Sequence, residues 1–152
     1  MKKDKQMNVM DIKIDFTKIG PGYVYCFNAE CKQAETCVHY LAGSQVPADK
    51  EMGLAVFPGA FRKRSCRFYH EAKEVTFAYG FEHIYDQVRR NDYTAMRKEL
   101  TLYLGNVGQY YRYKHGEKGL SPAQQKHIVE VFRRYGYTED IVFDRYEQQL
   151  EY

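Results

Sequence analysis

Alternating apolar and polar positions predict short strands in the first half of the chain. A period of two, which indicates a strand with one buried face, runs through Asp11–Phe16 and again through Glu74–Tyr79. Gly20-Pro21-Gly22 turns the chain after the first of these segments. A short apolar run, Met52–Phe57, predicts another strand, which Pro58-Gly59 stops.

Helical spacing dominates the second half. Phe81–Arg90 and Tyr93–Leu104 place apolar residues three and four positions apart, as a helix with one buried face requires. The clearest helix follows, because an N-cap, a proline at the first helical position and a capping-box glutamine stand in order at Ser121, Pro122 and Gln124. Gly136 supplies its left-handed stop.

Three further segments are less clearly patterned. Gln33–Leu41 favours a short helix that Gly43 ends. Residues 109–113 fit a strand or a continued helix, and the tail fits a strand around 141–143 or a helix that Asp144 caps. Strands first and helices later indicate an α+β fold, with short strands and a cysteine-rich loop in the N-terminal half and a helical C-terminal half.

Length and composition fit one small globular domain. The chain has 152 residues, of which 44% are hydrophobic and 28% charged, and it has no linker-like stretch. We expect a single domain over residues 1–152, with residues 1–10 as a candidate disordered end. The 15 tyrosines, against no tryptophan, suit half-buried positions around a core.

The chain carries neither a membrane-spanning apolar run nor the apolar stretch of a secretory signal. We therefore expect a soluble cytoplasmic protein without a membrane partner. Thiols stay reduced in the cytoplasm, so its four cysteines are expected as free or metal-bound side chains rather than disulfides.

Those cysteines are the main candidate for chemistry. Cys26, Cys31 and Cys37 follow one another as C-x4-C-x5-C, and Cys66 stands further along. Four thiolates fill the tetrahedral shell of zinc, and a ligand distant in sequence would tie two segments together. His39 and His70 lie close behind Cys37 and Cys66, and either is a possible substitute ligand.

Other interpretations of the cysteines stay open. An iron–sulfur cluster takes the same four ligands. Buried free thiols behave as small apolar side chains and need no metal. A thiol-dependent enzyme would use Cys66 with His70 as its base, but no third orienting group accompanies them. His83, His115 and His127 stand alone, as surface or capping residues do.

A basic segment suggests a nucleic-acid partner as an alternative. Its positive charges are Arg62, Lys63, Arg64 and Arg67, and three tyrosines that could stack on bases follow further along, at Tyr110, Tyr111 and Tyr113. Residues 62–134 hold fifteen Lys and Arg against eight acids, whereas residues 135–152 hold one Arg against five acids. An acidic tail that neutralises the basic middle is the simpler explanation.

The chain also resembles a known family. The segments that carry the resemblance are CFNAECKQAETCVHYLAG, SCRFYHEAKEVTFAYGF, YYRYKHGEKGLSPAQQKHIVEVFRRYGY and FDRYEQQLEY. In order and spacing they are similar to a family of short bacterial proteins catalogued as a domain of unknown function. The resemblance implies a stand-alone one-domain protein that shares the cysteine pattern, and it implies no activity or catalytic residue.

These observations lead to one preferred hypothesis. We expect a non-enzymatic binding or interaction protein in which Cys26, Cys31, Cys37 and Cys66 hold a structural zinc ion. A nucleic-acid-binding protein is the first alternative and a thiol-dependent enzyme the second.

Overall fold

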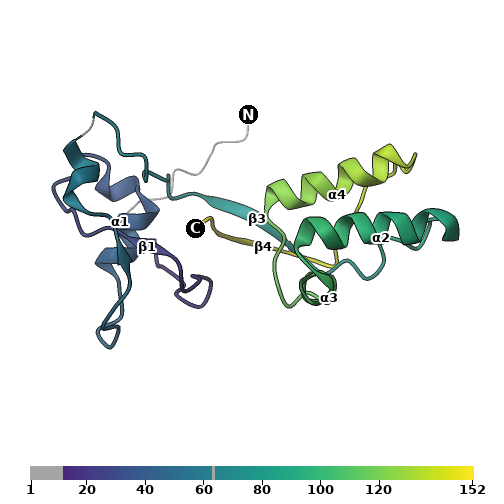
Figure 1. Ribbon diagram of the computed structural model, residues 1–152, viewed down its shortest axis with the longest axis horizontal. Coiled ribbons are helices and arrows are strands. Elements are labelled where there is room, and N and C mark those ends of the chain that lie inside the picture. The colour runs from purple at the N-terminus through teal and green to yellow at the C-terminus, as the bar shows by residue number, and fades with distance from the viewer. Residues whose placement is uncertain (1–11, 63) are drawn as a thin grey trace. The chain divides into compact units, whose positions relative to one another are not determined.

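The computed structural model describes residues 12–62 and 64–152 and divides into two compact units (Figure 1). One unit is formed by Met1–Lys73 with Leu150–Tyr152, and the other by Glu74–Gln149. Each unit has a buried apolar core of its own. Helices and short strands occur together, so the predicted α+β class is confirmed. The expectation for residues 1–10 lies outside the described residues.

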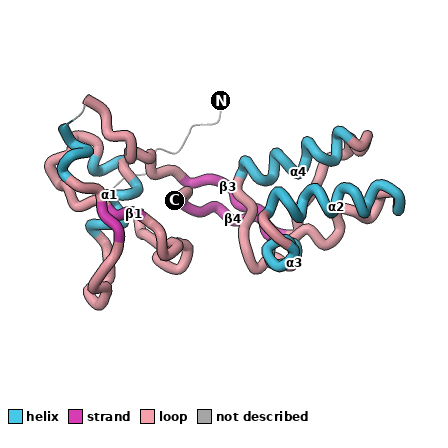
Figure 2. The backbone as a smooth tube through the Cα atoms, in the orientation of Figure 1, coloured by secondary structure: helices cyan, strands magenta, loops and turns pink. Residues whose placement is uncertain are grey.

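Little regular structure holds the N-terminal unit (Figure 2). Its elements are β1 (Val24–Tyr25), a 3-10 turn (Ala34–Thr36), α1 (Val38–Ser44), β2 (Leu54–Ala55) and a second 3-10 turn (Pro58–Arg62). The two strands pair in parallel, with Val24 opposite Leu54 and Tyr25 opposite Ala55. Much of this unit is therefore loop, whose shape depends on contacts other than a sheet.

The predicted strand at Asp11–Phe16 is wrong for its described part. Ile14 is buried in the core of the N-terminal unit, as the alternation implied. Its N–H, however, donates to Oε1 of Gln45 at 3.1 Å, and Nε2 of the same side chain donates to the carbonyl of Ile12 at 2.9 Å. A glutamine side chain thus satisfies this backbone in place of a neighbouring strand.

The helix of the cysteine segment starts at Val38 rather than Gln33. Cys37 is extended (φ −96°, ψ 120°) and forms an antiparallel bridge with Glu71, which separates the 3-10 turn from α1. Gly43 lies within α1 and does not end it. The predicted strand at Met52–Phe57 is reduced to the two residues of β2.

Helices make up most of the C-terminal unit. Its elements are β3 (Glu74–Tyr79), α2 (Arg90–Leu104), α3 (Val107–Lys114), α4 (Pro122–Arg134) and β4 (Arg145–Leu150). β3 pairs with β4, while α2 packs on α3 and on α4 (Figure 1). Fully buried apolar side chains from these elements share one core, among them Ala78, Met96, Leu100, Tyr110, Ile128 and Val131. Within the described residues, no helix is long and apolar enough to span a membrane.

Two predictions for this unit need correction. Residues 81–89 form turns instead of a helix, because the N–H of Phe81 donates to the carbonyl of Lys114 and the N–H of Arg89 to the hydroxyl of Tyr137. The tail forms strand β4 directly after Asp144, where the alternative prediction placed a helix, and residues 141–143 are not a strand. Residues 109–113, which sequence left open, are helical.

The capping box of α4 is confirmed and yields a prediction. Ser121 Oγ accepts the N–H of Gln124 at 3.3 Å, and Gln124 Oε1 accepts the N–H of Ser121 at 2.9 Å. Ser121→Ala should lower the free energy of unfolding by about 1 kcal/mol, since a backbone donor of the first turn loses its acceptor. Thr138→Ala, at an exposed position of the same unit, is the control. Equal denaturation midpoints for the two variants would contradict a stabilising cap.

Candidate metal centre

All four cysteines line one small cavity of the N-terminal unit. Its volume is about 20 Å³, which accommodates a guest of about one water molecule. The lining combines sulfur, one imidazole and apolar or aromatic side chains, contributed by Cys26, Cys31, Gln33, Ala34, Cys37, His39, Tyr40, Val56, Phe61, Cys66, Phe68 and Tyr69. The structure therefore brings together the residues that the sequence singled out as ligands.

Backbone contacts bring the cysteine-bearing segments together. The N–H of Cys26, just after β1, donates to the carbonyl of His39 in α1 at 3.0 Å. The segment that follows Cys66 is joined to the start of α1, because the N–H of Val38 donates to the carbonyl of His70 at 2.9 Å. Main-chain hydrogen bonds therefore bring residues that are far apart in sequence together.

The thiols also influence one another electrostatically. Burial raises the pKa of the Cys26 thiol, and charge on Cys37, Cys31 and Cys66 raises that pKa further, while a backbone hydrogen bond at Asn28 lowers it. All four cysteines are free thiols. Several thiolates so close together would repel one another in the absence of a cation.

His39 adds a nitrogen donor to the cavity. Its Nδ1 lies 2.6 Å from the carbonyl oxygen of Val24. A carbonyl oxygen only accepts hydrogen bonds, so Nδ1 carries the proton, and Nε2 of the neutral ring keeps a lone pair. Tyr23 stacks on this ring, with centroids 5.0 Å apart. A histidine fixed through Nδ1 in this way is typical of metal sites.

His70 is placed differently. Its ring lies edge-on to His39, with centroids 6.5 Å apart, but the side chain is not among those that line the cavity. Its Nε2 is buried and has no hydrogen-bond partner among the described residues. Cys66 therefore makes no hydrogen bond to His70 Nε2, and the nucleophile–base pair considered from sequence lacks this contact.

The four cysteines line a common cavity, but this alone does not place them for metal coordination. Over residues 12–62 and 64–152, no three or more His, Cys, Asp or Glu side chains stand in an arrangement ready to hold a metal ion. The chemistry of the donors nevertheless fits zinc, which binds thiolate sulfur and imidazole nitrogen. Coordination would require the four sulfur atoms to lie closer together than they do among the described residues.

The basic segment lies beside the cysteine cavity. Arg62, Arg64 and Arg67 are exposed, and the guanidinium of Arg67 lies over the ring of Phe68, 4.8 Å from its centroid. Lys63 lies outside the described residues. Among the described residues, no carboxylate forms an ion pair with these three arginines.

Two of the three tyrosines that sequence associated with base stacking are buried, and the third is half-buried. Tyr110 and Tyr113 are buried in the core of the C-terminal unit, with 1% and 5% of their surface exposed. The hydroxyl of Tyr111 accepts a hydrogen bond from Arg97 at 2.9 Å. A helical period of apolar and aromatic residues produced this pattern, so the interleaved tyrosines are core and boundary residues.

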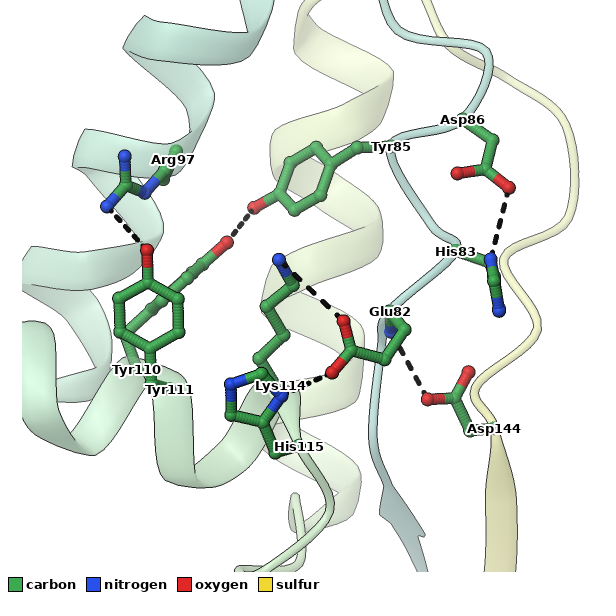
Figure 3. Close-up of polar contacts among 10 residues, drawn as sticks. All are labelled: Glu82, His83, Tyr85, Asp86, Arg97, Tyr110, Tyr111, Lys114, His115 and Asp144. Carbon is green, nitrogen blue, oxygen red and sulfur yellow. Dashed lines mark hydrogen bonds and ion pairs between the residues drawn. The ribbon is translucent and has the colours of Figure 1, made fainter.

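A polar cluster in the C-terminal unit was missed from sequence (Figure 3). The carboxylate of Glu82 contacts His115 and forms an ion pair with Lys114 at 3.8 Å. The backbone N–H of Glu82 donates to the carboxylate of Asp144 at 3.2 Å. His83 likewise faces Asp86 at 3.3 Å. Both histidines are exposed, as expected of surface or capping residues, and His115 is the C-cap residue of α3. Sequence did not indicate the carboxylates that turns of the backbone bring to them.

Tyrosine hydroxyls form the second part of this cluster (Figure 3). Tyr110 donates to Tyr85 at 3.1 Å. Burial raises the pKa of Tyr85 well above its ordinary value, and burial raises the pKa of Tyr110 to about 12. Both hydroxyls are therefore neutral at physiological pH, which suits a structural hydrogen bond better than proton transfer.

The Glu82 contact predicts a pH-dependent contribution to stability. The hydrogen bond with His115 lowers the pKa of Glu82 below its ordinary value of 4.5. A lowered folded-state pKa stabilises the fold above the unfolded value and loses that effect as pH falls through the folded value. Glu82→Gln should therefore lower the melting temperature slightly at pH 7, and this difference should vanish in acid.

Glu139→Gln, at an exposed position, controls for the loss of one charge. Thermal denaturation between neutral pH and pH values well below the ordinary glutamate pKa of 4.5 measures both variants. A Glu82→Gln deficit that stays constant over this range would contradict an ionised contact.

Gly43 yields a further prediction, because α1 touches the cysteine loop there without space for a side chain. A Cβ atom at Gly43 would lie 2.0 Å from the carbonyl oxygen of Cys26. Gly43→Ala should destabilise the chain by roughly 2 kcal/mol or more and make Cys26 react faster with thiol reagents. Gly22→Ala, where nothing lies within 4 Å, should change neither. Unchanged thiol reactivity in Gly43→Ala would contradict this role.

Comparison with known proteins gives one match. The model of a family of unknown function (DUF6078) matches residues 1–152. No curated protein and no solved structure matches the chain.

Proposed function

The chain belongs to this family of unknown function, and we propose that it is a non-enzymatic binding protein whose N-terminal unit is organised around a structural zinc ion. Cys26, Cys31, Cys37 and Cys66 are the proposed ligands. The observation that carries the proposal is the common cavity that these four thiols line.

The size of the cavity favours zinc over an iron–sulfur cluster. A volume of about 20 Å³ suits a single ion, whereas a cluster adds several iron and sulfide atoms within its ring of cysteines. Because His39 lines the same cavity and its Nδ1 is engaged by the carbonyl of Val24, Nε2 of His39 is the proposed substitute ligand should one cysteine stay unligated. His70 is the weaker substitute, since it does not line the cavity.

A structural role follows from how the N-terminal unit is built. Its strands have two residues each, and its buried apolar core is small, comprising Ile14, Tyr25, Val38, Leu41, Ala42 and Leu150. Small units of this kind are commonly stabilised by a metal ion. A site with four cysteine ligands also fills every tetrahedral position of zinc and leaves none open for substrate.

The cytoplasm is the proposed location, because four unpaired thiols are compatible with a reducing compartment. Nucleic-acid binding remains the second candidate. It is favoured by the exposed arginines of residues 62–67, which lack a carboxylate partner among the described residues. Retention on DNA or heparin that weakens steeply with salt would support it.

Metal analysis tests the main proposal. Protein purified without added metal should contain one zinc ion per chain and show no visible absorbance. Cys66→Ser should lose the zinc and lower the melting temperature, since binding free energy contributes to folding. Cys66→His should retain zinc, because imidazole is an equivalent ligand.

Ser65→Ala, next to Cys66 in sequence, is the matched control and should keep both zinc and stability. Purified protein that contains no zinc, and whose melting temperature Cys66→Ser leaves unchanged, would contradict the proposal. A thiol that reacts with iodoacetamide far faster than an ordinary cysteine would instead favour the thiol-dependent enzyme.

A further inference from the structure

Exposed apolar side chains gather around β2 in the N-terminal unit. Met52, Leu54 and Phe57 expose 86%, 55% and 77% of their surface. Phe27 and Phe61 are also exposed. Scattered apolar residues are normal on a protein surface, but a contiguous set marks an interaction site.

Two hollows lie along this strand and meet at one residue. The first has a volume of about 340 Å³ and is lined by Ala55, Val56, Phe57, Gly59, Ala60, Arg67 and Phe68. The second has a volume of about 310 Å³ and is lined by Tyr25, Phe27, Val46, Lys50, Glu51, Met52, Gly53, Leu54 and Ala55. Because Ala55 lines both, the two hollows adjoin each other along β2, and together they are here called the β2 groove.

The edge of β2 that faces away from β1 is a candidate for pairing with a further strand. Within the described residues, its sheet contains only β1 and β2. The N–H of Val56 donates to the carbonyl of Tyr25 at 2.8 Å, on the β1 side. Successive residues of a strand direct their N–H and C=O groups to opposite edges, so those of Ala55 point away from β1. An extended peptide could pair there and place its side chains in the hollows.

The charged residues of the β2 groove indicate which kind of segment binds in it. Arg67 lines the groove, and Arg62 and Arg64 lie near it in sequence; none of the three pairs with a carboxylate among the described residues. The other end of the groove contributes one charge of each sign, from Lys50 and Glu51. The groove is therefore apolar along its length and positive at one end.

We propose that the β2 groove binds an extended protein segment in which bulky apolar side chains are followed or preceded by Asp and Glu residues. The proposal rests on the binding role proposed above and names its partner class, but it does not require zinc. Nucleic acid fits the groove less well, because its walls are apolar and two tyrosines of the proposed stacking segment are buried in the core. Residues 1–11 do not complement the positive end of the groove, because they contain three lysines and only two acidic residues.

A phage-displayed library of random peptides, selected against the purified full chain, tests the proposal. Selected peptides should combine Leu, Ile or Phe with Asp and Glu. A selected peptide, synthesised with a fluorescent label, should bind Phe57→Ser and Arg67→Glu at least about tenfold more weakly than the unaltered chain. Replacement of its acids by Lys should weaken binding to the unaltered chain and restore binding to Arg67→Glu.

Matched controls lie on the C-terminal unit. Leu102→Ser changes an apolar side chain that is 70% exposed, and Lys126→Glu reverses an exposed charge; neither should alter peptide affinity. Zinc content and melting temperature are measured for every variant, which separates the two proposals. Absence of zinc from the unaltered, folded chain together with normal peptide binding would remove the metal proposal alone.

Several results would overturn the groove proposal. One is that the folded, zinc-bound protein enriches no peptide from the library. Another is that it enriches basic peptides. A third is that all four variants bind the selected peptide with equal affinity. Competition by single-stranded DNA at the same Arg67-dependent site, without peptide binding, would assign the groove to nucleic acid. A concentration-dependent dimer that Phe57→Ser abolishes, again without peptide binding, would assign it to a second copy of the chain.

Discussion

The close approach of α1 to the loop after β1 is the constraint on which the N-terminal unit depends. Gly43 lies against the carbonyl of Cys26, and a side chain there would overlap that oxygen. The same pair of segments is held by the hydrogen bond from Cys26 N–H to the carbonyl of His39. Because strands and core are small in this unit, backbone contacts of this kind determine where the sulfur atoms lie.

The cysteine cavity and the β2 groove share part of their walls. Val56 and Phe68 line both. Each side chain has one face toward the thiols and contributes apolar surface to the groove. A cation that drew the thiols together would therefore fix the wall against which a partner segment docks, and this gives a structural metal a place in a binding function.

The C-terminal unit follows a different physical plan. Fully buried apolar side chains from β3 and three helices form its core, and a capping box satisfies the first turn of α4. Its polar cluster around Glu82 joins surface turns through hydrogen bonds and ion pairs. Stability in this unit comes from apolar burial and capped helices, which need neither metal nor partner.

Sequence alone determined the elements whose signals are local. The strand at Glu74–Tyr79 and the cap, proline and glycine of α4 depend on neighbouring residues, and the structure reproduces them, although burial along β3 does not alternate. The cysteine spacing named four residues that do line one cavity, because a short stretch with three of them has limited reach. The resemblance to a family of unknown function was likewise stated from the sequence, and a family model matches residues 1–152.

Tertiary structure decided whatever depended on distant partners. Residues 12–16 have the alternation of a strand, yet the side chain of Gln45 satisfies their backbone. Residues 81–89 have helical spacing, yet Lys114 and Tyr137 take up their N–H groups. Only the folded structure shows that His39 lines the cysteine cavity and His70 does not. It likewise shows that Ala55 lines two hollows. The local pattern of apolar residues predicts which side chains are buried. The hydrogen-bond partner of each polar group is determined only when the whole unit folds.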